Sequence, residues 1–466
     1  MSTARGTTLR IAPRAFVARV ALIVVTIAAI ALLWRSPLRP DASVRFKLAT
    51  PIRSFALLLV ATYVGAWLIL LAWTRGSVTS TLKRALLCTS SAVLFLGLLE
   101  IPALLGWIDY RFVLPTPVST NTPGVKPWRN PRNQSDPELL WTRRPGLHLV
   151  GTAPGDCVGW LGIATERRYP YELVHDELGF RNPRTHERAS IALIGDSFVE
   201  GALVGADDLA SARLTRDLET EVVNLGMSGY GPQQELVVLR RHALRLSPEL
   251  VFWFFFEGND LTDVARYPGM REEWGATVER MQGFGELSFS ANLLRVLARA
   301  CAPRIASDLP TAIRRSATLR LPGPHKGETI YFPYLPGPLM DECRESLKVV
   351  EQILKEARAA CVERATRLVC VFVPDRARVY RGLIDAAPTA EALTAAPNEL
   401  PRLLADFCRR STIEWIDLTP PLHERACTGE LLYFHDDGHW NAQGHAAVAD
   451  HLAAYVRATR GPDATR

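Results

Sequence analysis

Three long apolar runs occupy the first part of the chain, at about residues 16–34, 54–73 and 85–108. Each approaches the roughly 20 apolar residues that an α-helix needs to cross a bilayer. Three such runs in succession fit poorly with buried helices of a soluble core. No small-residue cleavage pattern follows the first run to mark it as a signal peptide. We therefore predict a membrane region over residues 1–112 with three transmembrane helices that contact the lipid bilayer.

Basic residues around these runs indicate an orientation. With a cytoplasmic N-terminus, the inner segments carry seven Lys and Arg residues, and the first outer loop carries five. The positive-inside rule favours this orientation, although so small an excess leaves the opposite one open. Three crossings would place everything after the third run outside the cytoplasm. For a bacterial chain, this predicts a multi-pass inner-membrane protein with a periplasmic or otherwise extracytoplasmic catalytic domain.

A proline-rich stretch follows the predicted membrane region. Residues 113–145 contain seven prolines, which disfavour both helix interiors and central strands. We interpret residues 113–188 as either a spacer or an extension that lies over the next domain. The cluster from Leu178 to Pro183 is interpreted as a structural loop.

From Ile191 onward, short apolar runs alternate with amphipathic stretches. This pattern predicts a parallel sheet covered by helices on both faces, in one domain over about residues 189–460. The predicted strands are 191–194, 221–225, 250–256, 367–373 and 413–418, and the predicted helices are 207–218, 233–246, 342–360, 390–409 and 441–459. Residues 261–338 interrupt the alternation and are interpreted as an insertion with a helix at 291–299, serving either as a lid or as packing.

Composition excludes some functions. The 466 residues include 54 basic and 48 acidic side chains, a net charge of +6, with no long basic stripe interleaved with aromatic residues. Nucleic acid is therefore not an expected partner. None of the eight cysteines has Cys-x-x-Cys spacing, so neither a zinc site of that type nor a thioredoxin-type motif is predicted. We expect no cofactor and no metal.

Four polar clusters lie just after predicted strands or just before the last predicted helix. Parallel strands present their carboxyl ends at one edge of a sheet, so clusters distant in sequence can meet there. The clusters are Gly195-Asp196-Ser197, Ser228-Gly229-Tyr230-Gly231, Gly258-Asn259-Asp260 and Asp436-Asp437-Gly438-His439.

In order and type, these clusters resemble the SGNH (GDSL) hydrolase family over roughly residues 178–458. Leu178-Gly179-Phe180-Arg181, Asp417-Leu418-Thr419-Pro420 and His439-Trp440-Asn441 further resemble membrane-anchored bacterial members related to polysaccharide O-acetyltransferases. The resemblance implies a three-layer α/β/α fold of flavodoxin-like type. It also implies acyl-transfer chemistry through a Ser-His-Asp triad.

The residues at the family positions suit that chemistry. A serine hydroxyl needs a base, and the resemblance assigns Ser197 as nucleophile and His439 as base. The oxyanion donors implied are the backbone N–H groups of Ser197 and Gly229 and the side-chain amide of Asn259. The carboxylate that orients His439 is either Asp437 or Asp436. The usual Asp-x-x-His spacing selects Asp436, whereas the following Trp440 favours Asp437.

Other readings compete with this one. His435, His439 and His445 with the two aspartates could ligate a cation, although Gly438 weakens a helix that presents both His435 and His439. The nucleophile elbow of α/β-hydrolases is absent, because Val199 stands where Gly-x-Ser-x-Gly requires a glycine. A non-catalytic envelope-binding or scaffold protein is a third reading.

The expected function is hydrolysis of O-acyl, chiefly acetyl, esters of cell-envelope carbohydrate or of another ester substrate. The alternative is an O-acyltransferase that moves the acyl group to a sugar hydroxyl. Three predicted helices are too few to carry an acyl donor across the membrane, so a transferase would need a separate acyl-donor protein in the membrane.

Overall fold

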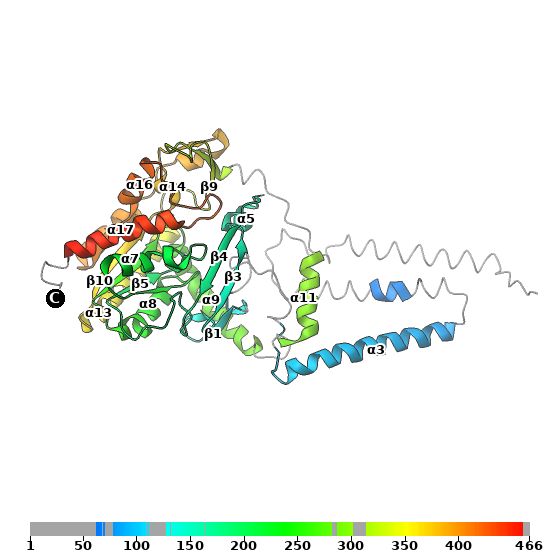
Figure 1. Cartoon of the computed structure of the whole chain (residues 1–466). Helices are drawn as coiled ribbons and strands as arrows, with labels where there is room; N and C mark the ends of the chain where they lie inside the picture. Colours follow the sequence, from blue (N-terminus) through cyan, green and yellow to red (C-terminus); the bar gives the residue numbers. More distant parts are fainter. Residues whose placement is uncertain are drawn as a thin grey trace, which may run out of the picture. The chain divides into compact units, whose positions relative to one another are not determined.

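A computed structural model (Figure 1) describes residues 62–67, 69, 78–108, 110, 127–130, 132–163, 165–281, 287–301 and 314–459. The chain divides into two compact units. The first comprises residues 1–118 and 280–306, and the second comprises residues 119–279 and 307–466. Each unit is described separately below.

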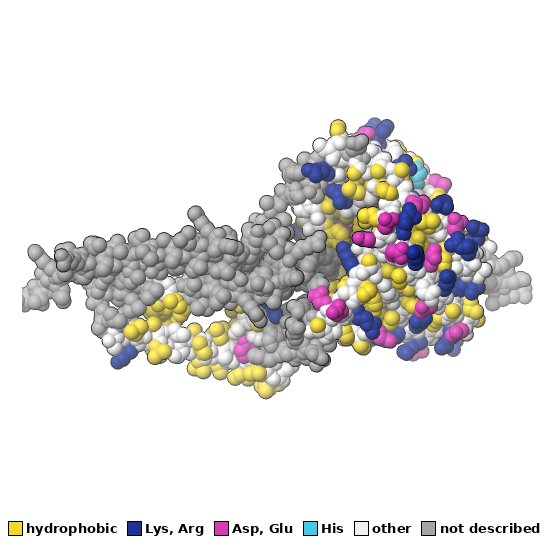
Figure 2. Space-filling model, turned by 180° about the vertical axis from the view of Figure 1, so that it is seen from behind, with side chains coloured by type: hydrophobic (Ala, Val, Ile, Leu, Met, Phe, Trp, Pro, Cys, Tyr) yellow, Lys and Arg dark blue, Asp and Glu magenta, His cyan; other side chains and the backbone are white. Residues whose placement is uncertain are grey.

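The first unit contains one long apolar helix among its described residues, α3 (Val78–Leu104). Its segment Leu82–Leu104 is long and apolar enough to cross a membrane. Large apolar side chains such as Leu86 and Leu94 are about two-thirds exposed, at 70% and 66%, as expected for a helix that has no protein partner around most of its surface. On the side of α3 that faces the viewer, Figure 2 shows many hydrophobic side chains. The predicted span 16–34 lies outside the described residues, and of 54–73 only residues 62–67 and 69 are described, as helix.

A second helix in this unit comes from the predicted insertion. The amphipathic pattern at 291–299 forms α11 (Phe289–Cys301), which contacts α3. Glu100 of α3 accepts hydrogen bonds from the backbone N–H groups of Phe289 and Ser290 at 2.9 and 2.7 Å. A carboxylate at a helix N-terminus satisfies otherwise unpaired N–H groups and complements the helix dipole. Part of the predicted insertion therefore packs on the apolar helix α3.

The second unit is built on a five-stranded sheet whose strands are all parallel to their neighbours. The strand order is β12-β10-β7-β5-β6. All five lie within one or two residues of the strands predicted from the apolar runs. Their bounds are β5 (Ile191–Gly195), β6 (Val222–Gly226), β7 (Leu250–Phe256), β10 (Arg367–Val373) and β12 (Glu414–Asp417).

Helices cover both faces of this sheet. Side chains alternate between the faces of a strand, so Phe254 and Val371 point to one side, and Trp253 and Cys370 point to the other. The first pair belongs to a buried cluster that also contains residues of α7 (Ala210–Leu218) and α17 (Ala442–Thr459). On the opposite face, α8 (Pro232–Arg241) contacts β5, and α13 (Asp341–Glu363) contacts β10. The result is the three-layer α/β/α arrangement.

One predicted helix is shorter than expected. Residues 390–409 were predicted as a single helix, but the structure has a 3₁₀ segment, η4 (Pro388–Thr394), and then α15 (Leu400–Arg410). Proline disfavours helical conformation in the preceding residue, and Pro397 lies in the gap. The side chain of Asn398 then accepts from the backbone N–H of Leu400 at 3.1 Å, at the start of α15. The prediction of one continuous helix was therefore wrong.

The described part of the proline-rich extension is folded. It forms two antiparallel strand pairs and a short helix within the second unit. Their bounds are β1 (Asn133–Asp136) with β2 (Leu140–Arg143), β3 (His148–Ala153) with β4 (Tyr169–Val174), and α5 (Asp156–Leu161). Trp141 is buried against Tyr230, with ring centroids 5.3 Å apart, and the Tyr230 hydroxyl donates to the Trp141 carbonyl at 2.5 Å. These contacts pack β2 of the extension against the loop that follows β6.

This unit also contains most of α9 (Asp260–Met281), together with α14 (Arg376–Val379), α16 (Thr419–Cys427) and an antiparallel sheet of order β11-β8-β9 (Ile384–Ala386, Ser316–Leu319 and Thr329–Tyr331). On the face in Figure 2, acidic and basic side chains are interspersed over this unit.

Candidate active site

Ser197 lies where the buried strand β5 ends. It is the first residue of a one-turn helix, α6 (Ser197–Glu200), whose N-cap is Asp196. The Asp196 carboxylate accepts from the backbone N–H of Phe198 at 2.9 Å, which fixes the turn. β5 lies between β7 and β6 in the sheet. The loops after all three strands therefore reach the same edge as Ser197.

His439 reaches Ser197 from the far end of the sequence. Its Nε2 lies 2.7 Å from Ser197 Oγ, and its Nδ1 lies 2.6 Å from Asp437 Oδ1. The structure therefore places Ser197, His439 and Asp437 in one hydrogen-bonded chain. Asp436 takes no part in it, since its Oδ1 accepts from the Tyr169 hydroxyl at 2.5 Å. Of the two carboxylates left open by the sequence, Asp437 is the one beside the imidazole.

The charges of His439 and Asp437 stabilise each other, so the two side chains favour an ion pair. Burial by itself would raise the pKa of Asp437, but the attraction and hydrogen bond of His439 hold it below its usual value. Burial would likewise lower the pKa of His439, and Asp437, with a smaller contribution from Asp156, raises it to about 9. Ser197 can pass its proton only to the neutral imidazole, which is the form present above this pKa.

Asp156 is a second carboxylate beside His439. It comes from α5, in the folded extension, and its Oδ2 lies 3.9 Å from His439 Nδ1. Its backbone N–H donates to Asp437 Oδ2 at 2.9 Å, and its Oδ1 accepts from the backbone N–H of Gly438 at 2.9 Å. Burial and the nearby Asp437 raise the pKa of Asp156 to about 6. Asp156 is therefore ionised in the pH range where His439 titrates.

The extension lies close to the loop that carries Asp437 and His439. A Cβ atom on Gly155 would lie 2.0 Å from the carbonyl oxygen of Asp436, so only glycine fits there. The backbone N–H of Cys157 donates to that same oxygen at 3.1 Å. These contacts hold the start of α5 against the loop that carries Asp437 and His439.

A buried arginine holds the other side of this loop. Arg376 is fully buried, and its Nη1 donates to the carbonyl oxygens of Phe434 and Asp437 at 2.9 and 2.8 Å. Its Nη2 donates to Cys157 Sγ at 3.3 Å. Arg376 therefore ties the loop backbone to both α14 and α5.

The predicted oxyanion donors lie on the loops after the two strands that flank β5. Gly229 follows β6 and has a φ of 84°, a left-handed conformation that favours glycine. Asn259 follows β7, and its amide nitrogen donates to Asp263 Oδ2 at 2.9 Å and also interacts with Asp196. The sheet order thus places both residues at the edge that carries Ser197, with the Asn259 amide held between two acidic side chains.

A buried ion pair supports the Gly229 loop. Glu200 Oε2 accepts from the backbone N–H of Ser228 at 2.8 Å, while Oε1 accepts from Arg143 Nε at 3.0 Å. His175 Nε2 lies 3.4 Å from the same Oε1. Burial would raise the pKa of Glu200, but Arg143 and His175 hold it well below its usual value. Glu200 therefore connects the nucleophile turn, the Gly229 loop and the extension.

The three histidines considered as metal ligands do not converge. His439 belongs to the chain with Ser197, and His445 Nδ1 accepts from the backbone N–H of Ala210 at 3.3 Å. His435 Nε2 lies 2.6 Å from Glu328 Oε2, and with His325 this set of ligand atoms falls within 4.8 Å. Because the Arg167 guanidinium lies 3.3 Å from His435 Nδ1, its positive charge opposes a cation at that set.

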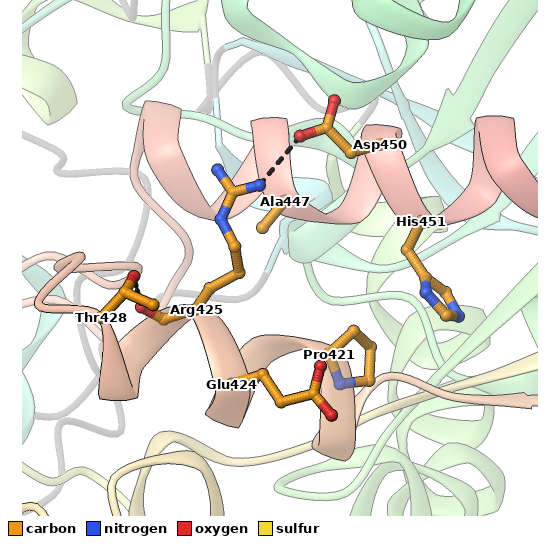
Figure 3. Close-up of a pocket in the computed structure, with 7 residues that line it drawn as sticks. All are labelled: Pro421, Glu424, Arg425, Thr428, Ala447, Asp450 and His451. Atoms are coloured by element: carbon orange, nitrogen blue, oxygen red, sulfur yellow. Dashed lines mark hydrogen bonds and ion pairs between the residues drawn. The ribbon is translucent and has the colours of Figure 1, made fainter.

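Figure 3 shows a hollow of about 350 Å³ between α16 and α17. Its lining residues are Pro421, Glu424, Arg425, Thr428, Ala447, Asp450 and His451. Arg425 Nη1 pairs with Asp450 Oδ2 across it at 3.0 Å. No member of the Ser197 chain lines this hollow, so it is not part of the candidate active site.

Sequence reasoning missed the supporting residues Asp156, Arg376, Arg143 and Glu200. Glu200 follows Ser197 by only three residues in the sequence, so its position was a usable signal. The other three come from the extension and from α14, and no spacing links them to the four polar clusters.

Residues 341–466 match the family model described as "SGNH hydrolase-like domain, acetyltransferase AlgX". That range contains Asp437 and His439, whereas Ser197 lies outside it. No curated protein sequence matches the chain.

Three solved structures with similarity to this chain are an acetylxylan esterase, a lipase/acylhydrolase and a GDSL-like lipase. The first is a catalytic mutant of Axe2 from Geobacillus stearothermophilus, with 13% identity and a TM-score of 0.30, covering 59% of this chain and 94% of that one. The second, from Enterococcus faecalis, has 14% identity, a TM-score of 0.28 and coverage of 57% and 95%. The third, from Bacteroides thetaiotaomicron, has 11% identity, a TM-score of 0.28 and coverage of 58% and 88%.

We predict that Asp437→Asn lowers kcat for ester cleavage by about a thousand- to ten-thousand-fold, because the amide neither orients the imidazole correctly nor stabilises its cation. Asp436→Asn is the matched control, since its remaining oxygen can still accept from Tyr169, and we expect less than a tenfold fall. Steady-state kinetics on 4-nitrophenyl acetate measure both. Equal falls in kcat for the two variants would show that Asp437 has no special role beside His439.

A second prediction concerns pH. Because His439 must be neutral to accept a proton, kcat/KM should fall as the pH drops below the pKa of His439, about 9. Asp156→Asn removes a negative charge that favours the imidazolium, so the acidic limb should move to lower pH. Asp385→Asn, at an exposed position, should leave the limb in place. An unmoved limb in Asp156→Asn would exclude an electrostatic role for Asp156.

A third prediction concerns stability. Glu200→Gln leaves Arg143 buried without a charge partner, a loss of about 3–5 kcal/mol that should lower the Tm of the full chain by roughly 5 °C or more. Since the pKa of Glu200 is depressed, its stabilisation is present at neutral pH and lost as the pH falls. Exposed Glu187→Gln is the control. If the Tm of Glu200→Gln lies within about 1 °C of the wild-type Tm, as for a surface substitution, the Arg143–Glu200 pair contributes nothing to stability.

Proposed function

We propose that the chain is a serine acyl-ester hydrolase. This proposal starts from the match of residues 341–466 to the SGNH hydrolase-like family model. The proposed substrates are O-acyl, chiefly O-acetyl, esters of cell-envelope carbohydrate. The observation that carries the proposal is the hydrogen-bonded chain from Ser197 through His439 to Asp437. The family description, which names an acetyltransferase, supports the choice of acetyl.

The first half of the reaction forms an acyl-enzyme. His439 Nε2 takes the proton of Ser197 as Oγ attacks the ester carbonyl carbon, and Asp437 stabilises the resulting imidazolium. The tetrahedral intermediate places a negative charge on the former carbonyl oxygen. The backbone N–H groups of Ser197 and Gly229 and the amide of Asn259 are the donors proposed for it. The intermediate collapses as the carbon–alkoxy bond breaks, and His439 gives its proton to the departing sugar hydroxyl.

The second half releases the acyl group. Water enters beside His439, which takes one of its protons while the oxygen attacks the acyl carbon of the Ser197 ester. A second tetrahedral intermediate then breaks the bond to Oγ. The proton on His439 returns to Ser197, and the products are a carboxylic acid and the free enzyme. No co-reactant other than water is required.

An O-acetyltransferase is the second candidate, favoured by the printed description of the family. In that case a sugar hydroxyl replaces water in the second half, and the same residues act. The acyl donor would be supplied by a separate membrane protein. Hydrolysis remains the first proposal because it requires no further component.

A membrane location fits either reaction. Among the described residues, Leu82–Leu104 of α3 is the segment of the proposed three-helix anchor that is long and apolar enough to cross a membrane. The charge distribution around the apolar runs favours a catalytic unit outside the cytoplasm, where envelope carbohydrate is found. We propose that the chain is a multi-pass inner-membrane protein with an extracytoplasmic active site.

The fourth prediction tests the nucleophile. The full chain in detergent should react with a fluorophosphonate probe and cleave 4-nitrophenyl acetate, and Ser197→Ala should abolish labelling and lower turnover by at least about a thousandfold. Ser411→Ala, at the end of α15, is the control and should behave like the wild type. Equal ester turnover by the wild type and Ser197→Ala would refute the mechanism.

The two candidate reactions can be separated in the same preparation. With 4-nitrophenyl acetate as donor, a hydrolase yields acetate whether or not an oligosaccharide is added. A transferase yields acetylated oligosaccharide at the expense of acetate. Mass spectrometry of the oligosaccharide distinguishes the two outcomes.

A further inference from the structure

Trp160 presents an aromatic surface to solvent within the catalytic unit. Its side chain is 50% exposed, whereas Cys157 and Leu161 of the same short helix, α5, are buried. A single exposed apolar residue is ordinary on a protein surface. Trp160 differs from such a residue because it lies near the Ser197 site, which suggests a role in substrate binding.

α5 is fixed to the catalytic loop at its first residue. Asp156 donates its backbone N–H to Asp437 and accepts from Gly438 N–H, both at 2.9 Å. Trp160 follows Asp156 by four residues, so the two lie about one helical turn, roughly 6 Å, apart along the same side of the helix. The contacts that position Asp437 therefore also position Trp160.

Tyr334 is partly buried and lies beside Trp160. Its ring centroid lies 6.1 Å from that of Trp160 and 5.5 Å from that of Phe256. A Cβ atom on Gly258 would lie 2.9 Å from Tyr334 Cδ2, which places the ring against the residue that precedes Asn259. Tyr334 thus borders the loop that carries a proposed oxyanion donor.

The segment that carries Tyr334 also touches the loop of the catalytic base. A Cβ atom on Gly438 would lie 3.0 Å from Cγ of Pro333. Pro333 and Tyr334 therefore span from the His439 loop to the Asn259 loop. Burial and nearby carboxylates, Asp156 first among them, keep the pKa of Tyr334 well above its usual value, so its hydroxyl stays protonated and able to donate a hydrogen bond.

We propose that Trp160 and Tyr334 form a subsite for a pyranose ring of the acyl-bearing carbohydrate, a proposal that rests on the proposed function. The axial C–H groups on one face of a pyranose carry partial positive charge and match the negative face of an indole or phenol ring. A sugar stacked on Trp160 would lie beside the wall formed by Pro333 and Tyr334. Its ester could then reach Ser197 between the two loops that this wall spans.

Binding in an inactive background tests the subsite independently of turnover. The full-length Ser197→Ala protein is titrated calorimetrically with an O-acetylated cello-oligosaccharide, in a polyoxyethylene detergent so that no sugar headgroup competes. Adding Trp160→Ala should raise Kd about tenfold, equivalent to about 1.4 kcal/mol. Adding Trp160→Phe should retain most of the affinity, because an aromatic face remains. Trp274→Ala, a partly exposed tryptophan of α9, is the control and should leave Kd unchanged.

An equal Kd with and without Trp160→Ala would overturn the subsite, as would the absence of any binding to Ser197→Ala. Turnover provides the separate test of the proposed function. If the oligosaccharide binds through Trp160 but the wild type releases no acetate from it, the hydrolase proposal fails and the subsite stands. If the wild type deacetylates the oligosaccharide, Trp160→Ala should lower kcat/KM for it about tenfold relative to 4-nitrophenyl acetate, mainly through KM.

Discussion

The hydrogen bond between Ser197 and His439 joins residues that are 242 positions apart. A bond of 2.7 Å tolerates little displacement of either partner, so both must be held by rigid surroundings. Ser197 is held by the end of β5 and by the Asp196 cap. His439 lies on a loop without regular structure, and its position depends on side chains from elsewhere in the catalytic unit. Much of the polar network in this unit serves that loop.

The loop is held from two directions. Arg376 binds two of its carbonyl oxygens from α14, and Asp156 binds Asp437 and Gly438 from α5. Both groups are charged and buried, so each would be costly to bury without the partners that it has here. Asp156 adds an electrostatic effect, because its charge strengthens the basicity of His439. The folded extension therefore contributes both to the position and to the chemistry of the base.

The same extension carries Trp160 of the proposed carbohydrate subsite. α5 begins beside the loop of Asp437 and His439 and carries the exposed Trp160 one residue before its end, while β2 supplies Arg143 to the buried pair with Glu200. A segment that lies over the carboxyl edge of a parallel sheet is well placed to shape what reaches that edge. In this chain, the extension reaches that edge in two places, with α5 near His439 and β2 near Gly229.

The sequence by itself determined the strands of the central sheet and the edge where the polar clusters meet. Those features depend on local apolar runs and on the parallel topology that alternating helices impose. It narrowed the carboxylate expected beside His439 to Asp436 or Asp437, and only the tertiary structure shows that Asp437 lies next to the imidazole, since neighbouring side chains point in different directions. Asp156 and Arg376 could not be predicted, because their contacts cross long stretches of chain with no periodicity to reveal them. The contact between Trp141 and Tyr230 was likewise decided only by tertiary packing, since no spacing in the sequence links the extension to the loop after β6.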